Sequence, residues 1–235
     1  MKISILTLFP SMFDGPFTES IIKRAVDAEV CEIEIVDIRD FTHDKHNTAD
    51  DTPYGGGCGM VMKVEPVVEA VESVTKDSPD ARVIYLSPQG PRFTQNKARE
   101  LAALPHLVLL CGHYEGIDER AFELAVHEEL SIGDYVLTGG ELPAMVVADS
   151  VIRLLPGAVG NDASVQNDSF WNGLLDCPHY TRPEEYRGLR VPGVLLSGHH
   201  AKIDEWRHQQ ALEKTHRIRP DLYETYHSTD PQDEA

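Results

Sequence analysis

The stretch Leu-Val-Leu-Leu-Cys-Gly-His-Tyr-Glu-Gly-Ile-Asp-Glu-Arg, residues 107–120, decides the fold class of this chain. It opens with the apolar run Leu107–Cys111, and a short run rich in Leu and Val is typical of a strand buried on both faces. Gly112 and Gly116 follow, and then Asp118-Glu119, whose charges favour the first turn of a helix. The stretch therefore predicts a strand, a glycine-containing loop and a helix, in that order.

The same alternation extends in both directions from this stretch. Further strands are predicted at Ile3–Phe9, Ile33–Ile38 and Val83–Ser87. A helix is predicted where Val64, Val67, Val68, Val71 and Val74 form an apolar stripe. Another is predicted to begin at Thr94, a good N-cap residue, and to stop before Pro105. Strands alternating with helices predict an α/β domain with a largely parallel sheet over residues 1–156.

Four loops of unusual composition are expected at strand ends. They cover Pro53–Met60, Leu86–Arg92, Cys111–Arg120 and Ser131–Pro143. Open α/β sheets bind ligands at the carboxyl ends of their strands, and glycine lets the backbone approach a ligand closely. The P-loop pattern and the Rossmann glycine pattern are both absent from the sequence. Because the loops hold few Lys and Arg residues, they suit a small neutral or cationic ligand better than a polyphosphate.

The segment Leu142–Leu155 is apolar on nearly every face, so it is expected to be a helix buried in the domain or in a subunit interface. Asp149 and Arg153 lie within it, four residues apart. They could form an internal salt bridge, or they could be polar groups kept at a site or interface, and the sequence leaves both interpretations open.

Three segments are predicted from composition: a domain over residues 1–156, a flexible linker over 157–170, and a small C-terminal domain over 171–235 that ends in an acidic tail. The clearest helix of the last segment is Ala201–Lys214. The net charge of −18 argues against nucleic acid as a partner when taken whole. However, residues 168–219 hold 8 Lys and Arg against 7 Asp and Glu, whereas residues 1–167 hold 13 against 27. The relatively basic part is thus C-terminal.

Composition excludes several classes of protein. Hydrophobic residues make up 41% and charged residues 26%, so the chain is globular rather than disordered. The longest apolar stretches are far too short to cross a membrane, and the N-terminus does not have the pattern of a signal peptide. The four cysteines form no C-x-x-C pair, which favours a reducing cytosol. His43 and His46 are interpreted as part of a solvated loop, and no metal site is predicted.

The segment from Asn167 to Pro183 combines Trp171, Tyr180, His179 and Arg182. Aromatic side chains among His and Arg suit base stacking and phosphate contact. Taken alone, the segment could equally be an ordinary domain junction.

Together, these motifs resemble those of the bacterial tRNA (guanine-N1)-methyltransferase family, the TrmD type. The resemblance rests on five parts of the chain: Tyr54–Met60, Gly112–Arg120, Ser131–Pro143, Asp168-Ser169-Phe170 with Leu174–Pro183, and Val194–Arg207. It implies an S-adenosylmethionine-dependent enzyme that methylates N1 of the guanine 3′ of the anticodon in tRNA. It also implies a SPOUT-type fold with a trefoil knot near the end of the first domain, a cytoplasmic homodimer with shared sites, and a small, mainly helical C-terminal domain that binds tRNA. Magnesium dependence is associated with the family.

The resemblance also implies roles for individual residues. Asp168 would be the general base and Arg153 would contact the target guanine. The cofactor site would include Leu86, Ser87, Pro88, Gln89, Gly90, Gly112, Tyr114, Glu115, Ile132, Gly133, Asp134, Tyr135, Val136, Leu137, Gly139, Gly140 and Pro143. Two rival functions are a methyltransferase of the same fold that acts on another RNA or another base, and an RNA-binding protein without catalytic activity.

Overall fold

The computed structural model describes residues 1–160 and 165–229, and the chain divides into two compact units. The N-terminal unit spans residues 1–160 and the C-terminal unit spans residues 161–235. The linker expected over 157–170 includes residues 161–164, and the expected acidic tail includes residues 230–235; both of these stretches lie outside the described residues.

The N-terminal unit is built on a five-stranded sheet in the order β2-β1-β6-β5-β7, in which every pair of neighbours is parallel. Its strands are β1 (Lys2–Thr7), β2 (Glu32–Asp37), β5 (Arg82–Leu86), β6 (His106–Cys111) and β7 (Glu128–Leu130). This confirms the prediction of an α/β domain with a largely parallel sheet. The four predicted strands are all present, shifted by one or two residues at their ends, whereas the short strand β7 was missed.

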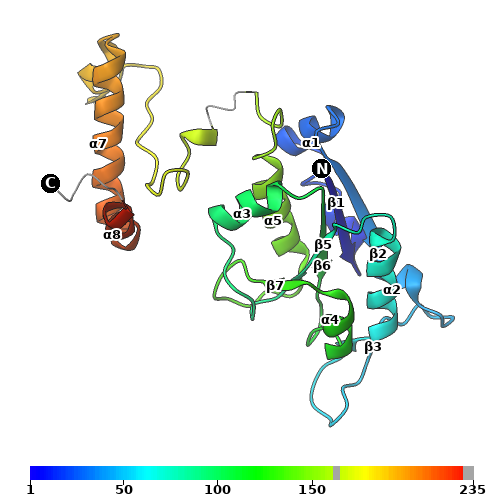
Figure 1. Cartoon of the computed structure of the whole chain (residues 1–235). Helices are drawn as coiled ribbons and strands as arrows, with labels where there is room; N and C mark the ends of the chain where they lie inside the picture. The colour runs from blue at the N-terminus through cyan, green and yellow to red at the C-terminus, as the bar shows by residue number, and fades with distance from the viewer. Residues whose placement is uncertain (161–164, 230–235) are drawn as a thin grey trace. The chain divides into compact units, whose positions relative to one another are not determined.

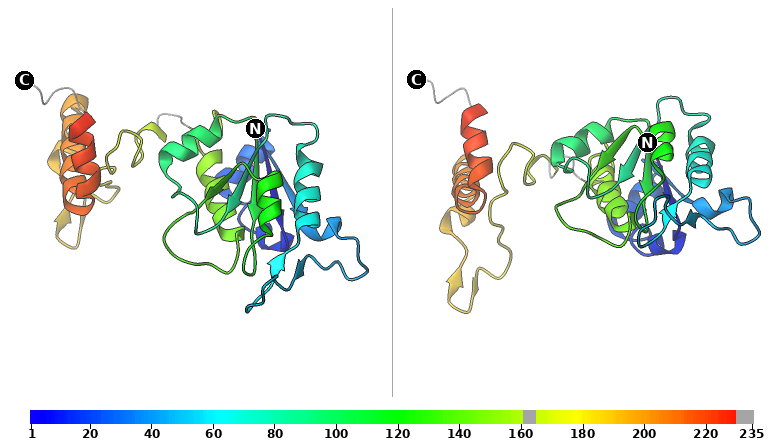
Figure 2. Two further views of the ribbon diagram at one scale, coloured as in Figure 1. Left: turned by 60° about the horizontal axis from the view of Figure 1, so that its bottom comes forward. Right: turned by 90° about the horizontal axis from the view of Figure 1, so that it is seen from below.

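Helices cover both faces of the sheet (Figures 1 and 2). One face packs against α1 (Ser20–Asp27), α3 (Gln95–Ala102) and α5 (Glu141–Ile152), and the other packs against α2 (Val64–Thr75) and α4 (Glu119–Ala125). Along β6, Leu107 and Leu109 belong to the first core, while Val108 and Leu110 belong to the second. Because successive strand residues point to opposite faces, one apolar run supplies both cores.

Two predicted helix starts are confirmed by their caps. The Thr94 side chain accepts a hydrogen bond from the backbone N–H of Lys97, and Asp118 accepts one from the N–H of Arg120. Each cap satisfies a donor that the first helical turn leaves free. Both helices begin directly after loops that follow strands of the sheet.

One of the four loops was wrongly placed by the sequence. Residues 53–60 do not follow a strand of the main sheet; they join β3 (Asp50–Asp51) to β4 (Val61–Met62), which form a separate two-stranded antiparallel hairpin. These strands have two residues each, too few to give a recognisable pattern of apolar side chains. The hairpin contacts the sheet region because the Met62 N–H donates to the Gly116 carbonyl (2.9 Å).

The helix predicted over Leu142–Leu155 is α5, and it buries one side only. Pro143, Ala144, Val147, Ala148 and Val151 are buried against the sheet. On the other side Leu142 is 50% exposed and Val146 is 45% exposed. Asp149 is also exposed, so it is not buried within its own domain, and its place at a site or subunit interface stays a prediction.

Among its described residues, the C-terminal unit contains the hairpin of β8 (Glu185–Tyr186) and β9 (Leu189–Arg190) and the long helices α7 (His200–Ile218) and α8 (Pro220–Thr229). The predicted helix at Ala201–Lys214 is therefore confirmed and is longer than expected. A loop that precedes the hairpin is attached to α7, because the Leu175 N–H donates to Thr215 Oγ1 (2.9 Å) and Lys214 Nζ donates to the Asp176 carbonyl (2.9 Å).

Candidate functional site

A cavity of about 490 Å³ lies at the carboxyl ends of three neighbouring strands, β6, β5 and β7. Its volume falls within the usual range for small-molecule sites. The walls come from the loops that follow these strands. The lining residues that the family resemblance had named are Leu86, Ser87, Pro88, Gln89, Gly112, Tyr114, Glu115, Ile132, Gly133, Tyr135, Val136, Leu137, Gly139, Gly140 and Pro143.

Backbone hydrogen bonds hold the three loops together. The Gly140 N–H donates to the Gly112 carbonyl (2.8 Å), and the Phe93 N–H donates to the Ser131 carbonyl (2.7 Å). A Cβ atom on Gly140 would lie 2.6 Å from Cys111 Cα, and one on Gly112 would lie 2.6 Å from the Tyr85 hydroxyl. Close packing against the backbone at Cys111 therefore requires glycine at position 140, whereas Gly112 leaves room for the side chain of Tyr85 on β5.

Two predicted cofactor residues do not line the cavity. Gly90 is next to β7 instead, where a Cβ atom would lie 2.6 Å from the backbone of Leu130. Asp134 is exposed and forms an ion pair with Arg92 (3.7 Å). Gly90 thus supports the loop, and Asp134 extends into solvent from it.

The polar residues of the wall that were not among the predicted site residues are Tyr85, His113, Glu119, Glu129, Ser131 and Thr138. Burial, with a further contribution from the charge of Glu129, raises the pKa of Tyr85 to about 12, so the phenol keeps its proton at neutral pH. The buried Nδ1 of His113 has no hydrogen-bond partner among the described residues. This nitrogen lies against the backbone of Gly139, where an added Cβ atom would come within 2.6 Å of it.

A buried carboxylate lies behind the cavity. Glu141, at the start of α5, is only 2% exposed, and its Oε1 accepts a hydrogen bond from Thr7 Oγ1 (2.8 Å). The bond connects the end of β1 to the loop that ends at Gly140. Burial, with a smaller effect from Glu141, keeps the pKa of the Cys111 thiol well above its usual value, so this cysteine is not a nucleophile at neutral pH.

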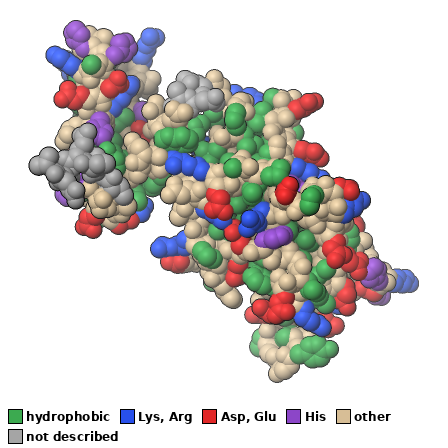
Figure 3. Space-filling model, in the orientation of Figure 1, with side chains coloured by type: hydrophobic (Ala, Val, Ile, Leu, Met, Phe, Trp, Pro, Cys, Tyr) green, Lys and Arg blue, Asp and Glu red, His purple; other side chains and the backbone are tan. Residues whose placement is uncertain are grey.

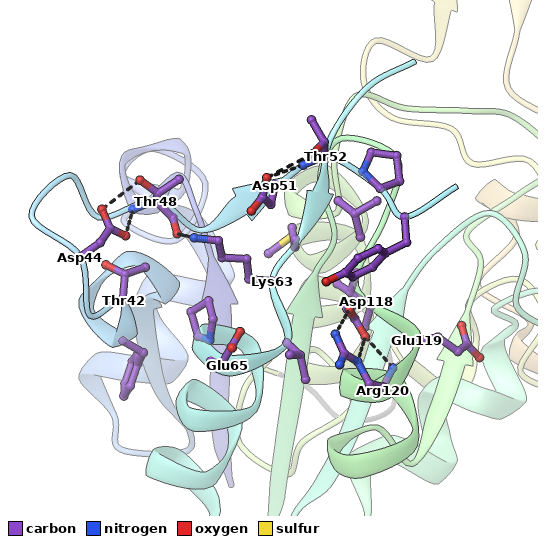
Figure 4. A pocket seen from close by; sticks show the side chains of 18 of the residues that line it. Thr42, Asp44, Thr48, Asp51, Thr52, Lys63, Glu65, Asp118, Glu119 and Arg120 are labelled. Carbon is purple, nitrogen blue, oxygen red and sulfur yellow. Dashed lines mark hydrogen bonds and ion pairs between the residues drawn. The ribbon is translucent and has the colours of Figure 1, made fainter. Parts of the chain in front are cut away.

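A second cavity, of about 1110 Å³, is lined by residues of the segments 41–54, 61–66 and 117–120 (Figure 4). The lysine and the arginine that line it both have partners within the protein. Lys63 donates to the Thr48 carbonyl (3.0 Å), and Arg120 pairs with Asp118 (2.7 Å). Asp44 accepts hydrogen bonds from the backbone N–H groups of His46 and Thr48, and these bonds hold the loop that contains His43 and His46. The 53–60 loop also approaches the first cavity, since a Cβ atom on Gly59 would meet the Glu115 carboxylate.

The two predicted catalytic residues lie in different units. Arg153 is the C-cap residue of α5 and is half-buried, and its N–H donates to the Asp149 carbonyl (3.2 Å). Asp168 belongs to the C-terminal unit and is half-buried in the loop that leads toward α7. The side chain of the next residue, Ser169, accepts a hydrogen bond from the N–H of Asp176 (2.9 Å). This bond connects the segment that contains Asp168 to a later part of the same loop.

Fold and site together define an α/β ligand-binding protein whose cavity is formed by glycine-rich loops after parallel strands. The family model described as "tRNA (Guanine-1)-methyltransferase TrmD" matches residues 1–225. The chain belongs to this family, and it is a tRNA (guanine-N1)-methyltransferase.

Curated relatives agree with the family model. The tRNA (guanine-N(1)-)-methyltransferase of Geobacillus kaustophilus is 56% identical over 232 residues, which are 99% of this chain and 95% of the relative. That of Bacillus cereus strain AH820 is 58% identical over 225 residues, which are 95% and 92% of the two chains. No helix among the described residues is long and apolar enough to cross a membrane.

Proposed function

We propose that this chain transfers a methyl group from S-adenosylmethionine to N1 of the guanine 3′ of the anticodon, and that the cavity at the ends of β5, β6 and β7 binds the methyl donor. The cavity is the observation that carries the proposal. Three glycine-rich loops meet there, and the described residues of its walls include no Lys or Arg. A zwitterionic donor with a cationic sulfonium fits such a lining better than a polyphosphate does.

The donor, when bound, supplies a methyl group already activated by a positive sulfur. What remains for the protein is alignment and proton transfer. Guanine N1 must lose its proton to become nucleophilic, and we assign that proton to the carboxylate of Asp168, a contribution of about 10²–10⁴-fold. Negative charge then develops on guanine O6, where the guanidinium of Arg153 would stabilise it. Bond formation from N1 to the methyl carbon and cleavage of the sulfur–carbon bond complete the transfer.

We assign donor binding to a domain of residues 1–156, a linker to residues 157–170, and tRNA binding to residues 171–235. The separation of the chain after Gly160 into two units, the first built on the parallel sheet, supports this division. The trefoil knot of the SPOUT class, within the first domain, and a cytoplasmic location are parts of the same proposal and rest on the family.

We further propose a homodimer whose two sites each combine a donor cavity from one chain with Asp168 from the other. The exposed Leu142 and Val146 on α5 support an interface there, because exposed apolar side chains on an otherwise buried helix are typical of subunit contacts. Mixing a Gly140→Val chain with an Asp168→Asn chain tests the sharing. Each homodimer should be inactive, but random pairing gives about half heterodimers, each with one intact site, and hence about a quarter of full activity. An inactive mixture that contains heterodimers would show that each site lies within one chain.

Magnesium has a weaker basis. Within the described parts of the chain, a single group of three or more ligand side chains lies close enough for one ion, and it includes a thiol. Magnesium prefers oxygen ligands alone, so these residues do not fit it and no step is assigned to it.

The decisive experiment compares two tRNA transcripts that differ only in the base 3′ of the anticodon, guanine in one and adenine in the other. With a labelled donor, we expect label only in the guanine transcript, and N1-methylguanosine after digestion. Label at another position would support a methyltransferase with a different target. Donor binding without any transfer would support an RNA-binding protein that lacks catalytic activity.

A further inference from the structure

Three side chains with different donor atoms come together in the C-terminal unit, on the loop attached to α7. A carboxylate oxygen of Asp176, the Sγ of Cys177 and a ring nitrogen of His179 all lie within 4.8 Å of one another. Donors to one metal ion in a tetrahedral site lie about 3.3–3.5 Å apart, given metal–ligand bonds of about 2.0–2.3 Å. A shift of about 1 Å would therefore bring the three atoms into range.

The backbone of this loop is already fixed. The N–H of Asp176 donates to Ser169 Oγ (2.9 Å), and the carbonyl of Asp176 accepts from Lys214 Nζ (2.9 Å). The N–H of Leu175 donates to Thr215 Oγ1 (2.9 Å). Two of these bonds run to α7, so the ligand-bearing segment is held by a helix, and little order would have to be gained when an ion binds.

The side chains divide into fixed and movable ones. Cys177 is 6% exposed, whereas the side chain of His179 is 75% exposed. Nε2 of His179 lies 2.7 Å from Oδ2 of Asp176, in a hydrogen bond. An ion can therefore enter from the solvent side, and rotation of the His179 ring can supply the required shift.

We propose that Asp176, Cys177 and His179 form a site for a zinc-like divalent cation, with a fourth position left for water. One sulfur, one nitrogen and one oxygen donor are the set that Zn²⁺ accepts and Mg²⁺ does not. When the ion binds, the thiol of Cys177 loses its proton to the buffer. His179 exchanges its hydrogen bond to Asp176 for a bond to the metal. The oxidation state of the metal does not change. No oxidation or reduction takes place.

A bound cation would tie both ends of the loop together. At one end, Asp176 is hydrogen-bonded to Ser169. At the other end, His179 precedes Tyr180, whose ring contacts that of Trp206 on α7 (centroids 6.3 Å apart). The ion would hold Asp176 and His179 next to each other. We therefore expect the ion to stabilise the C-terminal unit. Because the site involves binding alone, it would stand even if Asp168 were not the catalytic base.

Cobalt(II) is the probe of choice, since it takes zinc sites and reports a thiolate ligand by a near-ultraviolet charge-transfer band. The full-length protein is freed of metal with a chelator, exchanged into chelator-free buffer and titrated. We expect one equivalent of Co²⁺ to give the thiolate band, Zn²⁺ to abolish it by displacement, and a large excess of Mg²⁺ to leave it unchanged. Absence of the band in the folded protein would overturn the proposal.

Variants locate the site. His179→Gln changes an exposed side chain and should fold normally, and we expect it to weaken Co²⁺ binding by at least about tenfold, the lower end of what even outer-shell ligand partners cost. Cys177→Ala should remove the thiolate band altogether. The matched control is Cys58→Ala, which removes the exposed cysteine of the N-terminal unit and should leave the band intact. A band that survives in Cys177→Ala, or is lost in Cys58→Ala, would place the thiolate elsewhere and refute the assignment.

Discussion

The cavity at the ends of β5, β6 and β7 and the Asp168–His179 loop of the C-terminal unit are held in place by different kinds of contact. The cavity loops are bonded backbone to backbone over a buried parallel sheet, as the Gly140–Gly112 bond illustrates. The Asp168–His179 loop is held largely by side chains, among them Ser169 and Thr215. Backbone contacts at glycine tolerate no added atom, whereas side-chain contacts can be changed singly. The two regions should therefore respond to mutation in separable ways.

Charge separates the two regions as well. On the face of the N-terminal unit visible in Figure 3, Lys and Arg side chains lie among Asp and Glu side chains. The sequence of that unit is strongly acidic, while residues 168–219 are close to neutral. If the proposed division of roles is right, attraction of the polyanionic tRNA should depend on the C-terminal unit, and binding of the donor should not.

The largest expected effect is that of Asp168→Asn on methyl transfer. Asparagine keeps the size of the side chain but cannot accept the N1 proton, so the single-turnover rate should fall by about 10²–10⁴-fold. Donor affinity, measured by calorimetry, should be unchanged, and a rise in pH should partly restore the rate because solvent then removes the proton. Asp204→Asn, which changes an exposed carboxylate of α7, is the control. A variant at Asp168 with a near-normal rate would end its assignment as the base.

Next in size is the effect of Gly140→Ala on donor binding. The added Cβ atom would lie 2.6 Å from Cys111 Cα, so the loop must move and the cavity must change shape. We expect donor affinity to fall by at least about 100-fold, equivalent to about 2.8 kcal/mol, while tRNA affinity changes little. Gly193→Ala, in the C-terminal unit, adds a Cβ atom in open space and should alter neither. Normal donor affinity in Gly140→Ala would contradict the proposal that this cavity binds the donor.

A third effect concerns tRNA affinity and its dependence on salt. Arg182, Arg187 and Arg207 belong to the C-terminal unit, where all three are exposed. Reversing their charge together should weaken tRNA binding by more than about tenfold. The slope of log K against log salt should flatten by about 0.7–0.9 for each phosphate group that the variant no longer neutralises. Donor affinity should stay the same.

The matched control reverses three exposed cations of the N-terminal unit, Lys23, Lys76 and Arg82. The change in net charge is identical, but these residues lie in α1, after α2 and at the start of β5, away from the strand ends that form the cavity. An equal loss of tRNA affinity in both triple variants would mean that net charge, and not the C-terminal unit, governs the attraction.

The smallest effects come from a pair of buried threonines, one in each unit. Thr7 donates to the Glu141 carboxylate and accepts from the Phe9 N–H, and Thr215 accepts from the Leu175 N–H. Thr7→Val should cost about 1.5–3 kcal/mol of unfolding free energy because its partner is charged, and Thr215→Val about 0.5–1.5 kcal/mol. Hydrogen exchange should show faster exchange at Phe9 in the first variant and at Leu175 in the second. Faster exchange at both amides in either variant would mean that the units do not unfold separately.

Elements whose signals are local could be predicted from the amino-acid sequence. Apolar runs such as Leu107–Cys111 predicted the buried strands, and Thr94 and Asp118 marked helix starts through caps made within three residues. Family motifs, which are also contiguous, identified the class of enzyme and most of the cavity lining. These features could be predicted because the interacting groups are neighbours along the chain.

Contacts between residues far apart in the sequence became visible only in the folded chain. Thr7 and Glu141 are 134 positions apart, and nothing in either local sequence indicates their bond. The same holds for Tyr85 and His113 in the cavity wall, for the 53–60 loop outside the main sheet, and for the exposure of Asp149. The spacing of Asp176, Cys177 and His179 matches no familiar metal motif, yet the fold of one loop places their donor atoms together. Burial and close approach depend on packing in three dimensions, and no local pattern records which distant backbone will lie against a given glycine.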